Sequence, residues 1–508
     1  MRGVLYWFPQ EGGIRRGTVE QEGRSTMTEA GEAMRVSAGS RMLLVGIAIS
    51  LWATSTWLLN VTAYPSFNGF FPLARDIATT LGAVFAVAFA LIAARRPRLF
   101  LRLGTLVVAL CCIGIGIAGM FWASMLESPL AAAIFACMRD LGSSLGCVFL
   151  ICALVGMSVR RCATLLVCGY AGKYVWMALL WFAPYSIRCA ALLVFSLASV
   201  TLLFICARPS MRQLESLSPS TSLDITNPRS FVPFTSRVFV VVLLFHAAFG
   251  FAITYGSVNS VPQPTIMAFV AFILAMGLVL IRGSVSLDAL FSLAFAFALL
   301  GMLIVSATPS GGAFAPLANA FLQAGSEVTS VVAYLLVVMI AVRNPTNLLS
   351  VWFGARCAMS VGTELGAASG HLENYLEVAN PGLAGVFVAV ITFGFVMFNF
   401  MLVRRFSFDA TVAQLQPVAP VEEVDEQDAR LPRIDMRCAE LAAAHSLTPR
   451  EAEVLALLAR GRNAAYIQES LTLSRNTVKS YVARVYSKLD VHSHQELIDL
   501  VEEKGSGE

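Results

Sequence analysis

The sequence predicts an all-α protein with two parts, a polytopic membrane bundle of about twelve helices and a C-terminal domain of four helices. Of its 508 residues, 57% are hydrophobic and 13% are charged, about half the charged fraction of an ordinary soluble domain. Residues 42–403 form successive apolar runs, each of about 18 to 25 residues and able to cross a hydrocarbon layer as a helix. Residues 447–503 are more polar and carry helix-capping residues at regular intervals.

The apolar runs define the expected membrane domain, residues 41–404. We expect its helices at about 42–62, 76–94, 103–123, 130–156, 163–183, 187–207, 236–256, 264–281, 286–307, 314–341, 347–368 and 381–403. Residues 1–40 are polar and lack the apolar core and cleavage site of a secretory signal, so we expect a cytoplasmic N-terminal segment. Met27 and Met34 are alternative starts.

Arginine placement predicts the orientation, because cationic residues concentrate in loops on the cytoplasmic side. The even-numbered turns are basic and hold Arg95, Arg96, Arg98, Arg102, Arg160, Arg161, Arg208, Arg212, Arg229, Arg237, Arg282, Arg343, Arg404 and Arg405. The opposite turns hold Glu127, Glu373 and Glu377, with Arg75 and Arg188 as their only cations. We therefore expect a multi-pass protein of the bacterial cytoplasmic (inner) membrane with both termini in the cytoplasm.

A Ser- and Pro-rich loop at about 208–235 divides the helices six and six. Gly142-Ser143 precedes Arg160 by the same interval as Gly325-Ser326 precedes Arg343, which indicates duplication. Six plus six helices around a central loop resemble the major facilitator architecture, which implies two parallel halves enclosing a midplane site. The Gly-x-x-x-Asp-Arg pattern of that family is absent, since residues 93–97 read Ala-Ala-Arg-Arg-Pro. The resemblance covers about 42–403.

Composition changes after Arg405. Residues 405–436 are rich in Pro, Val and acids, and we expect a flexible linker. Residues 437–508 form the expected C-terminal domain.

Capping residues set the helices of that domain. Thr448 precedes Pro449 and is followed by Glu451, which forms a capping box, and Gly461 ends this first helix. Asn463 caps a short second helix.

Ser474 caps the third helix, and Ser493 with Glu496 repeats the capping box for a fourth. The third helix has a buried stripe at helical spacing, formed by Val478, Val482, Val485 and Leu489. The fourth helix directs Leu497, Ile498, Leu500 and Val501 toward a core or a partner.

The other side of the third helix is basic, with no acidic residue between Ser470 and Leu489. It carries Arg475, Asn476, Lys479, Ser480, Ala483, Arg484 and Lys488. A short helix pair that places the second helix in the major groove is the helix-turn-helix geometry, in which cations contact phosphates and polar tips contact bases. The alternative is a solvated basic face without function.

The stretch resembles the LuxR-type helix-turn-helix domain over about 60 residues. The matching residues are Leu447-Thr-Pro-Arg-Glu451, Val454-Leu455, Gly461, Ile467, Leu471, Ser474, Thr477-Val478-Lys479 and Lys488-Leu489. The resemblance implies that Thr477 and Lys479 touch the backbone of double-stranded DNA, and that Lys479, Ser480 and Ala483 approach bases. It also implies a homodimer through the last helix, about 494–503. Tyr481 stands where the family often has His, and Ala464 to Gln468 also depart from its pattern.

Charged residues within membrane helices are costly and are candidates for function. Lys173, Glu327, Arg356 and Glu364 fall inside the predicted spans, and we expect them to line a polar cavity that meets a small charged or polar ligand. The alternative is that two of them form a structural pair. Arg139 and Asp140 are expected near the membrane interface, and His246 is a further mid-span ionisable residue.

The function expected is that of a membrane-embedded one-component regulator, in which the bundle senses a ligand or a membrane state and the C-terminal domain binds DNA. No receiver domain and no phosphate-binding Gly-rich loop occur. The eleven cysteines lie mostly in apolar stretches, so we expect small buried side chains rather than a metal site. The apolar runs show no clustered nucleophile with a base and no metal constellation, so we expect no cofactor and no enzymatic activity. The alternative function is a transporter with a regulatory DNA-binding tail.

Overall fold

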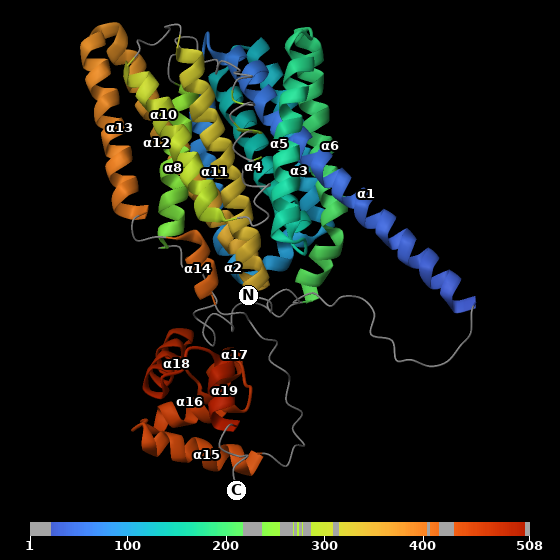
Figure 1. Ribbon diagram of the computed structural model, residues 1–508, viewed down its shortest axis with the longest axis vertical. Coiled ribbons are helices and arrows are strands. Elements are labelled where there is room, and N and C mark those ends of the chain that lie inside the picture. The colour runs from blue at the N-terminus through green and yellow to red at the C-terminus, as the bar shows by residue number, and fades with distance from the viewer. Residues whose placement is uncertain are drawn as a thin grey trace.

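The computed structural model describes residues 22–216, 236–254, 286–307, 314–403, 407–415 and 431–502, with isolated positions between 268 and 277. These residues are almost entirely helical and contain no β-strand (Figure 1). The predicted all-α class is confirmed.

Helices of the first half cover the predicted spans, but the last of them continues to Ser216, nine residues into the segment predicted to be a loop from about 208. They are α1 (Glu22–Leu58), α2 (Ala74–Arg95), α3 (Leu103–Met125), α4 (Pro129–Leu154), α5 (Val159–Trp181) and α6 (Tyr185–Ser216). α1 is longer than expected, because it begins inside the segment assigned to residues 1–40. It continues through a π-helical turn at Leu59–Ala63 and a 3₁₀ turn at Tyr64–Phe67. Hydrophobicity revealed only the apolar part of this helix.

The second half contains α8 (Arg237–Thr254), α10 (Leu287–Ala307), α11 (Ala315–Arg343), α12 (Leu348–Ala379) and α13 (Pro381–Val403). The span expected at 264–281 lies outside the described residues apart from isolated positions. Within the described ranges, nine helices are long and apolar enough to cross a membrane. α8 is a shorter apolar helix, and α12 carries Arg356, Glu364, Glu373 and Glu377. The protein is therefore a multi-pass membrane protein.

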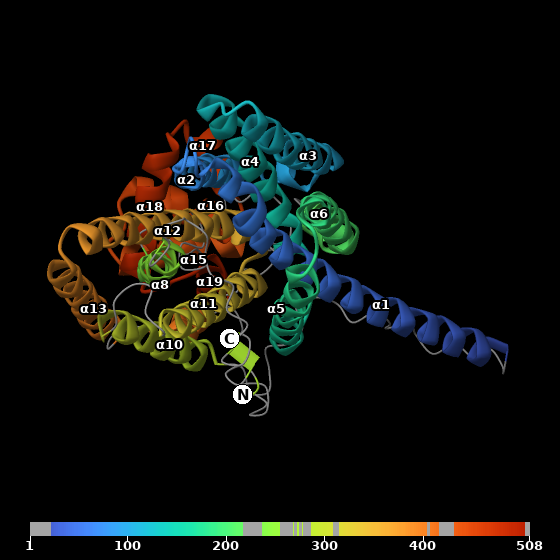
Figure 2. The same ribbon diagram turned by 90° about the horizontal axis from the view of Figure 1, so that it is seen from above.

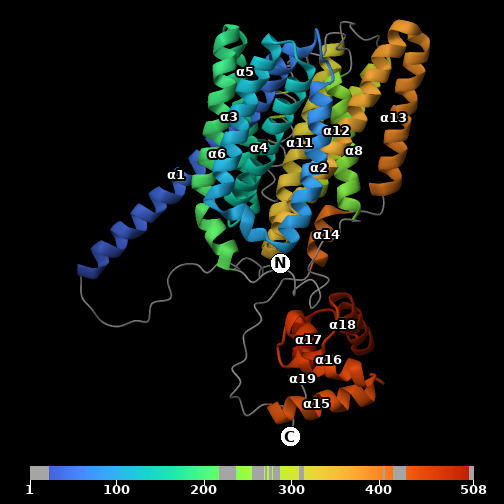
Figure 3. The same cartoon turned by 180° about the vertical axis from the view of Figure 1, so that it is seen from behind.

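The two halves meet along a few helices. α2 lies against both α4 and α12 (Figure 3), and the contacts between residues also place α5 against α11. Seen from above, α8, α10, α12 and α13 gather apart from α1, α5 and α6 (Figure 2). Side chains on α4, α5, α11 and α12 can therefore meet across the boundary between the halves.

Glycines bring α8 and α12 close together. A Cβ atom at Gly250 would collide with the Thr363 carbonyl, and one at Gly366 would collide with the Ala247 carbonyl. Gly362 faces the Leu243 carbonyl in the same way. Small residues at such spacing let helix backbones approach in a membrane, where packing rather than hydrophobicity drives association.

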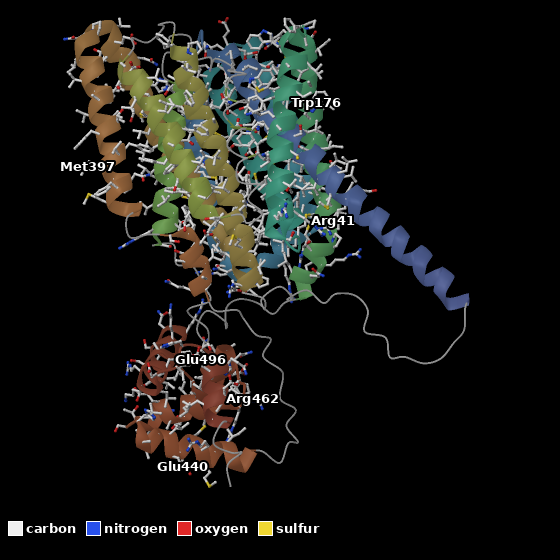
Figure 4. All side chains as sticks on the ribbon, in the orientation of Figure 1. Arg41, Trp176, Met397, Glu440, Arg462 and Glu496 are labelled. Carbon is white, nitrogen blue, oxygen red and sulfur yellow. The ribbon has the colours of Figure 1, made fainter. Side chains whose placement is uncertain are left out.

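The outer surface of the bundle is apolar. Met397 projects outward from α13 (Figure 4), and Phe393 and Phe400 on the same helix are 67% and 58% exposed. Large exposed apolar side chains of this kind suit contact with lipid tails rather than water.

A short helix, α14 (Phe408–Gln414), lies in the segment predicted to be a linker. Ser407 Oγ donates to the Asp288 carboxylate, and the Phe408 N–H donates to Asp288 Oδ1 at 2.7 Å. In return, Ser286 Oγ donates to Asp409 Oδ2 at 2.6 Å and the Leu287 N–H donates to Asp409 Oδ1 at 3.2 Å. We call this reciprocal set of bonds the α10–α14 clasp.

The clasp changes where the linker can begin. Phe408 is 1% exposed, and its ring lies 5.2 Å from that of Phe291 in the membrane-domain core. Residues 407–415 are thus part of the membrane domain, and the expectation of a linker from residue 405 does not describe them. Residues 416–430 lie outside the described part of the chain.

The C-terminal domain has its own hydrophobic core. It contains the expected helices α16 (Pro449–Ala459), α17 (Ala464–Leu471), α18 (Arg475–Leu489) and α19 (His494–Glu502). An additional helix, α15 (Leu431–Ala444), precedes them and buries Cys438 and Leu441 in that core. The domain therefore begins before residue 437, within the segment predicted to be linker.

Candidate functional site

Lys173 of α5 and Glu327 of α11 form an ion pair, with both side chains 7% exposed. Tyr174 Oη donates to Glu327 Oε2 at 3.0 Å, and Gln323 Nε2 lies 3.4 Å from Glu327 Oε1. The Lys173 ammonium also lies 4.5 Å from the centre of the Tyr174 ring. Charge and hydrogen bonds are thus satisfied inside the cluster, which joins the two halves.

Arg139 and Asp140 lie ten residues inside α4, and not near its end as expected. Arg139 Nη1 is 3.8 Å from Asp140 Oδ1, and the two side chains are 9% and 14% exposed. Arg356 of α12 attracts Asp140 electrostatically across the boundary between the halves. Counting ten residues into an apolar run would have placed Arg139 and Asp140 in the interior.

Glu364 does not join either group. Its carboxyl lies close to Thr79, Thr80 and Asp76 of α2. Asp76 Oδ2 in turn lies 3.0 Å from His371 Nε2. The structure therefore brings Lys173 and Glu327 together, places Arg356 with Asp140, and leaves Glu364 on the α2 side. That all four line one ligand cavity remains a prediction.

His246 is buried at 7% exposure on α8, and its Nδ1 lies 3.0 Å from the Val242 carbonyl of its own helix. This contact ties the ring to the preceding turn of the helix.

In the C-terminal domain, side-chain caps position the helices as predicted. The Glu451 N–H donates to Thr448 Oγ1 at 3.4 Å, and the Thr448 N–H donates to Glu451 Oε2 at 2.9 Å, which completes the capping box. Asn463 Oδ1 accepts from the Tyr466 N–H at 2.9 Å, and Ser474 Oγ accepts from the Thr477 N–H at 3.2 Å.

The last helix begins with a similar cap. The Glu496 N–H donates to Ser493 Oγ at 3.2 Å, as expected. The Glu496 carboxylate accepts from the N–H of His492 at 2.7 Å.

α18 presents two different faces. Val478, Val482, Val485 and Leu489 are at most 5% exposed, which confirms the buried stripe. The opposite face exposes Arg475, Asn476, Lys479, Ser480, Ala483 and Arg484. The Arg484 guanidinium lies 5.3 Å from the centre of the Tyr481 ring, which supports it over the helix surface.

Thr477 is half-buried, and its hydroxyl lies 2.7 Å from Ser474 Oγ within the cap. This hydrogen bond holds Thr477 at the start of α18, close to Arg475 and Asn476.

Lys488 has a different surrounding from the other predicted DNA-binding residues. Its ammonium donates to Glu451 Oε2 at 2.7 Å and to the Ser446 carbonyl at 2.9 Å. These bonds tie the end of α18 to the start of α16, and the hydrogen bond from Lys488 lowers the pKa of Glu451 to about 2. Its contacts are therefore internal, a role that sequence reasoning did not assign to it.

Comparison with known proteins identifies this region. Residues 445–501 match the family model of bacterial regulatory proteins, luxR family. The C-terminal domain is a LuxR-type helix-turn-helix domain.

Curated relatives match over the same domain. The transcriptional regulatory protein DesR of Bacillus subtilis (strain 168) is 40% identical over 62 residues, which cover 12% of this chain and 31% of DesR. The transcriptional activator protein ExaE of Pseudomonas putida is 42% identical over 64 residues, 13% of this chain and 30% of ExaE. The chain thus spans about a third of the length of these two relatives.

Solved structures resemble the membrane part. The Escherichia coli fucose:proton symporter FucP aligns with a TM-score of 0.45 and 13% identity, over 71% of this chain and 98% of FucP. A bacterial homologue of the iron transporter ferroportin aligns with a TM-score of 0.49 and 12% identity, over 70% of this chain and 98% of the homologue. These likenesses carry no conclusion about what the membrane domain binds.

The LuxR-type domain ends in α19, whose apolar residues divide in two. Leu497 and Val501 are buried in the domain core, whereas Ile498 and Leu500 are partly exposed. His494 is buried and its Nε2 lies 2.6 Å from the Leu458 carbonyl, which fixes α19 against α16. Burial lowers the pKa of His494.

Proposed function

We propose that this protein is a membrane-embedded one-component transcriptional regulator of the bacterial inner membrane, with both termini in the cytoplasm. The observation that carries the proposal is the exposed cationic face of α18, held in a capped LuxR-type domain on the same chain as a membrane bundle.

The proposed DNA contacts lie on α18. Arg475, Lys479 and Arg484 reach phosphates, while Asn476, Ser480 and Ala483 approach base edges in the major groove. Thr477 contacts the backbone from the first turn of the helix. Lys488 keeps its internal bonds and is left out of the contact set. Two copies bind together through Ile498 and Leu500 of α19, whose side chains the domain core does not fully cover.

The α10–α14 clasp provides the proposed route from sensing to DNA. The bundle has two arrangements, and a ligand or membrane state shifts the equilibrium between them. It can do so only if it stabilises one arrangement more than the other. Because α14 is bonded to the start of α10, a movement of α10 displaces the residue from which the chain leaves the bundle. The position or pairing of the DNA-binding domains then changes.

The test is a map of DNA occupancy by the full-length protein in its host. Wild type is compared with Lys479→Ala plus Arg484→Ala, and with Arg437→Ala plus Arg450→Ala as a control that removes two cations from other helices. Discrete sites that disappear only in the α18 variant support the proposal. Unchanged occupancy in that variant, with the protein present at normal levels, refutes it.

A further inference from the structure

The charges inside the membrane domain do not balance around Asp140. Arg139 and Arg356 flank this single carboxylate, one from its own helix and one from α12. Arg139 is 8% exposed, and its Nε is buried without a hydrogen-bond partner. Its only ion pair among the described residues is the 3.8 Å contact with Asp140.

Arg356 is the second cation without a close partner. It lies near the middle of α12 and is neither fully buried nor fully exposed. In the described part of the chain its guanidinium takes part in no ion pair or side-chain hydrogen bond, and Asp140 attracts it from a longer distance. Cys147, Tyr170 and Tyr334 are its other electrostatic neighbours.

The neighbouring charged groups do not supply the missing negative charge. Glu327 is paired with Lys173 and accepts a hydrogen bond from Tyr174, and Glu364 lies about two turns further along α12, close to Thr79, Thr80 and Asp76 of α2. His246 is fixed to its own helix by the Val242 carbonyl and carries no negative charge. Among the described residues, Arg139 and Arg356 thus share the single carboxylate of Asp140, and an arginine that no carboxylate contacts closely is costly away from water.

We infer that an anionic group, a carboxylate or a phosphate, binds between Arg139 of α4 and Arg356 of α12. Guanidinium groups offer paired N–H donors that match the two oxygens of such groups. Each half contributes one arginine, so the bound anion would hold the halves together and favour one arrangement of the bundle. The inference names the ligand class for the sensor and rests on the proposed function for its effect on DNA.

Asp140 is expected to compete with the anion. Its carboxylate occupies the space left by the missing side chain of Gly82 on α2, where a Cβ atom would collide with it. Removing its charge should therefore strengthen anion binding, whereas removing the Arg356 charge should abolish it. Opposite effects from two neighbouring substitutions would not arise from general destabilisation.

The experiment measures thermal unfolding of the full-length protein in phosphatidylcholine nanodiscs. Acetate, benzoate and inorganic phosphate are added at millimolar concentration, with chloride at matched ionic strength as the control. At least one should raise the unfolding midpoint by about 2–5 °C in wild type, more in Asp140→Asn, and not at all in Arg356→Gln. Nanodiscs containing phosphatidylglycerol form a second arm, and a shift confined to that arm assigns the anion to a lipid headgroup.

No anion-dependent shift in wild type or Asp140→Asn, in either lipid, would overturn the inference. So would an equal shift in Arg356→Gln. DNA binding by the same nanodisc samples is measured in parallel. Intact DNA binding with no anion effect would refute the anion site alone, whereas loss of specific DNA binding in wild type would count against the proposed function itself.

Discussion

Lys488 fits the pattern of cationic residues predicted to bind DNA, but its ammonium makes hydrogen bonds within the domain. Its position continues the cationic row of α18, yet its ammonium holds Ser446 and Glu451 of the preceding segment. Helical spacing identified the buried valines and the exposed face correctly. It could not identify the partner of Lys488, because Glu451 is distant in sequence and meets it only after α16 and α18 have packed.

Salt dependence of DNA binding separates the two roles. A lysine that neutralises a phosphate releases counterions, so Lys479→Ala should reduce the slope of log affinity against log salt by about one. Lys488→Met should leave that slope unchanged, because its charge is already paired within the domain. Fluorescence anisotropy over a salt series makes the comparison. Equal losses of slope in both variants would contradict the assignment.

Acid should destabilise the C-terminal domain in two stages. Burial depresses the pKa of His494, so the unfolded state takes up its proton first and stability declines as the pH falls below about 6.5. Glu451, with a pKa of about 2, contributes stability that is complete above its ordinary pKa of 4.5 and is lost as the pH falls toward 2.

Urea unfolding of residues 431–508, which have their own core, measures both stages by circular dichroism. Glu451→Gln should remove the lower stage and leave the upper one. Lys488→Met should cost about 1 kcal/mol at neutral pH, since the carboxylate loses a partly exposed charged partner. A wild-type stability that stays constant from pH 7 to pH 3 would disprove the assignment of both groups.

At the scale of elements, long apolar runs and capping residues were sufficient to predict most of the helices. α14 and α15 were missed, each for a different reason. α14 has seven residues, too few to form a helix alone, and depends on Asp288 from a distant part of the chain. α15 begins directly after an acidic, proline-containing stretch. It buries Cys438 and Leu441, and two apolar positions next to such a stretch are too few to indicate a helix.

Removing the clasp carboxylates should loosen α14. Asp288→Ala plus Asp409→Ala deletes the acceptors of the Phe408 and Leu287 N–H groups at the two helix starts, and each such bond contributes about 1 kcal/mol. Backbone amides of residues 408–414 should then exchange with solvent roughly tenfold or more faster, as measured by hydrogen exchange and mass spectrometry. Asp288→Asn plus Asp409→Asn keeps an acceptor oxygen at each position and should retain most of the protection. Unchanged exchange in the alanine variant would show that α14 is held by its buried side chains Phe408, Val412 and Leu415 rather than by the clasp.

The whole molecule depends on pairs that join distant segments. Sequence reasoning selected Lys173, Glu327 and Arg356 because charge inside a membrane is costly. The packing of α5 against α11 and of α4 against α12 decides which of these charged residues meet. A single sequence does not show which helices pack against each other. Tyr174 was overlooked for the same reason, although it stands next to Lys173.

Removing one charge of the Lys173–Glu327 pair should lower the free energy of unfolding more than removing both charges. Lys173→Met or Glu327→Gln alone leaves one buried group without its counter-charge and should cost about 3–5 kcal/mol. The double variant removes both charges and should recover a large part of that loss. Unfolding of the purified membrane protein in detergent compares the three variants. A double variant as unstable as the sum of the single variants would rule out a direct energetic coupling.

The α10–α14 clasp also sets how far the DNA-binding domain can lie from the membrane domain. It fixes the chain to the bundle up to Leu415, and the first helix of the DNA-binding domain begins at Leu431. The residues between them can extend over at most about 58 Å. Under the proposed function, a promoter must therefore come within a short distance of the membrane before the protein can bind it, and two copies that diffuse in the same membrane would meet in two dimensions. Regulation by this protein would depend on chromosome position, a dependence that moving a target promoter to a distant locus would reveal.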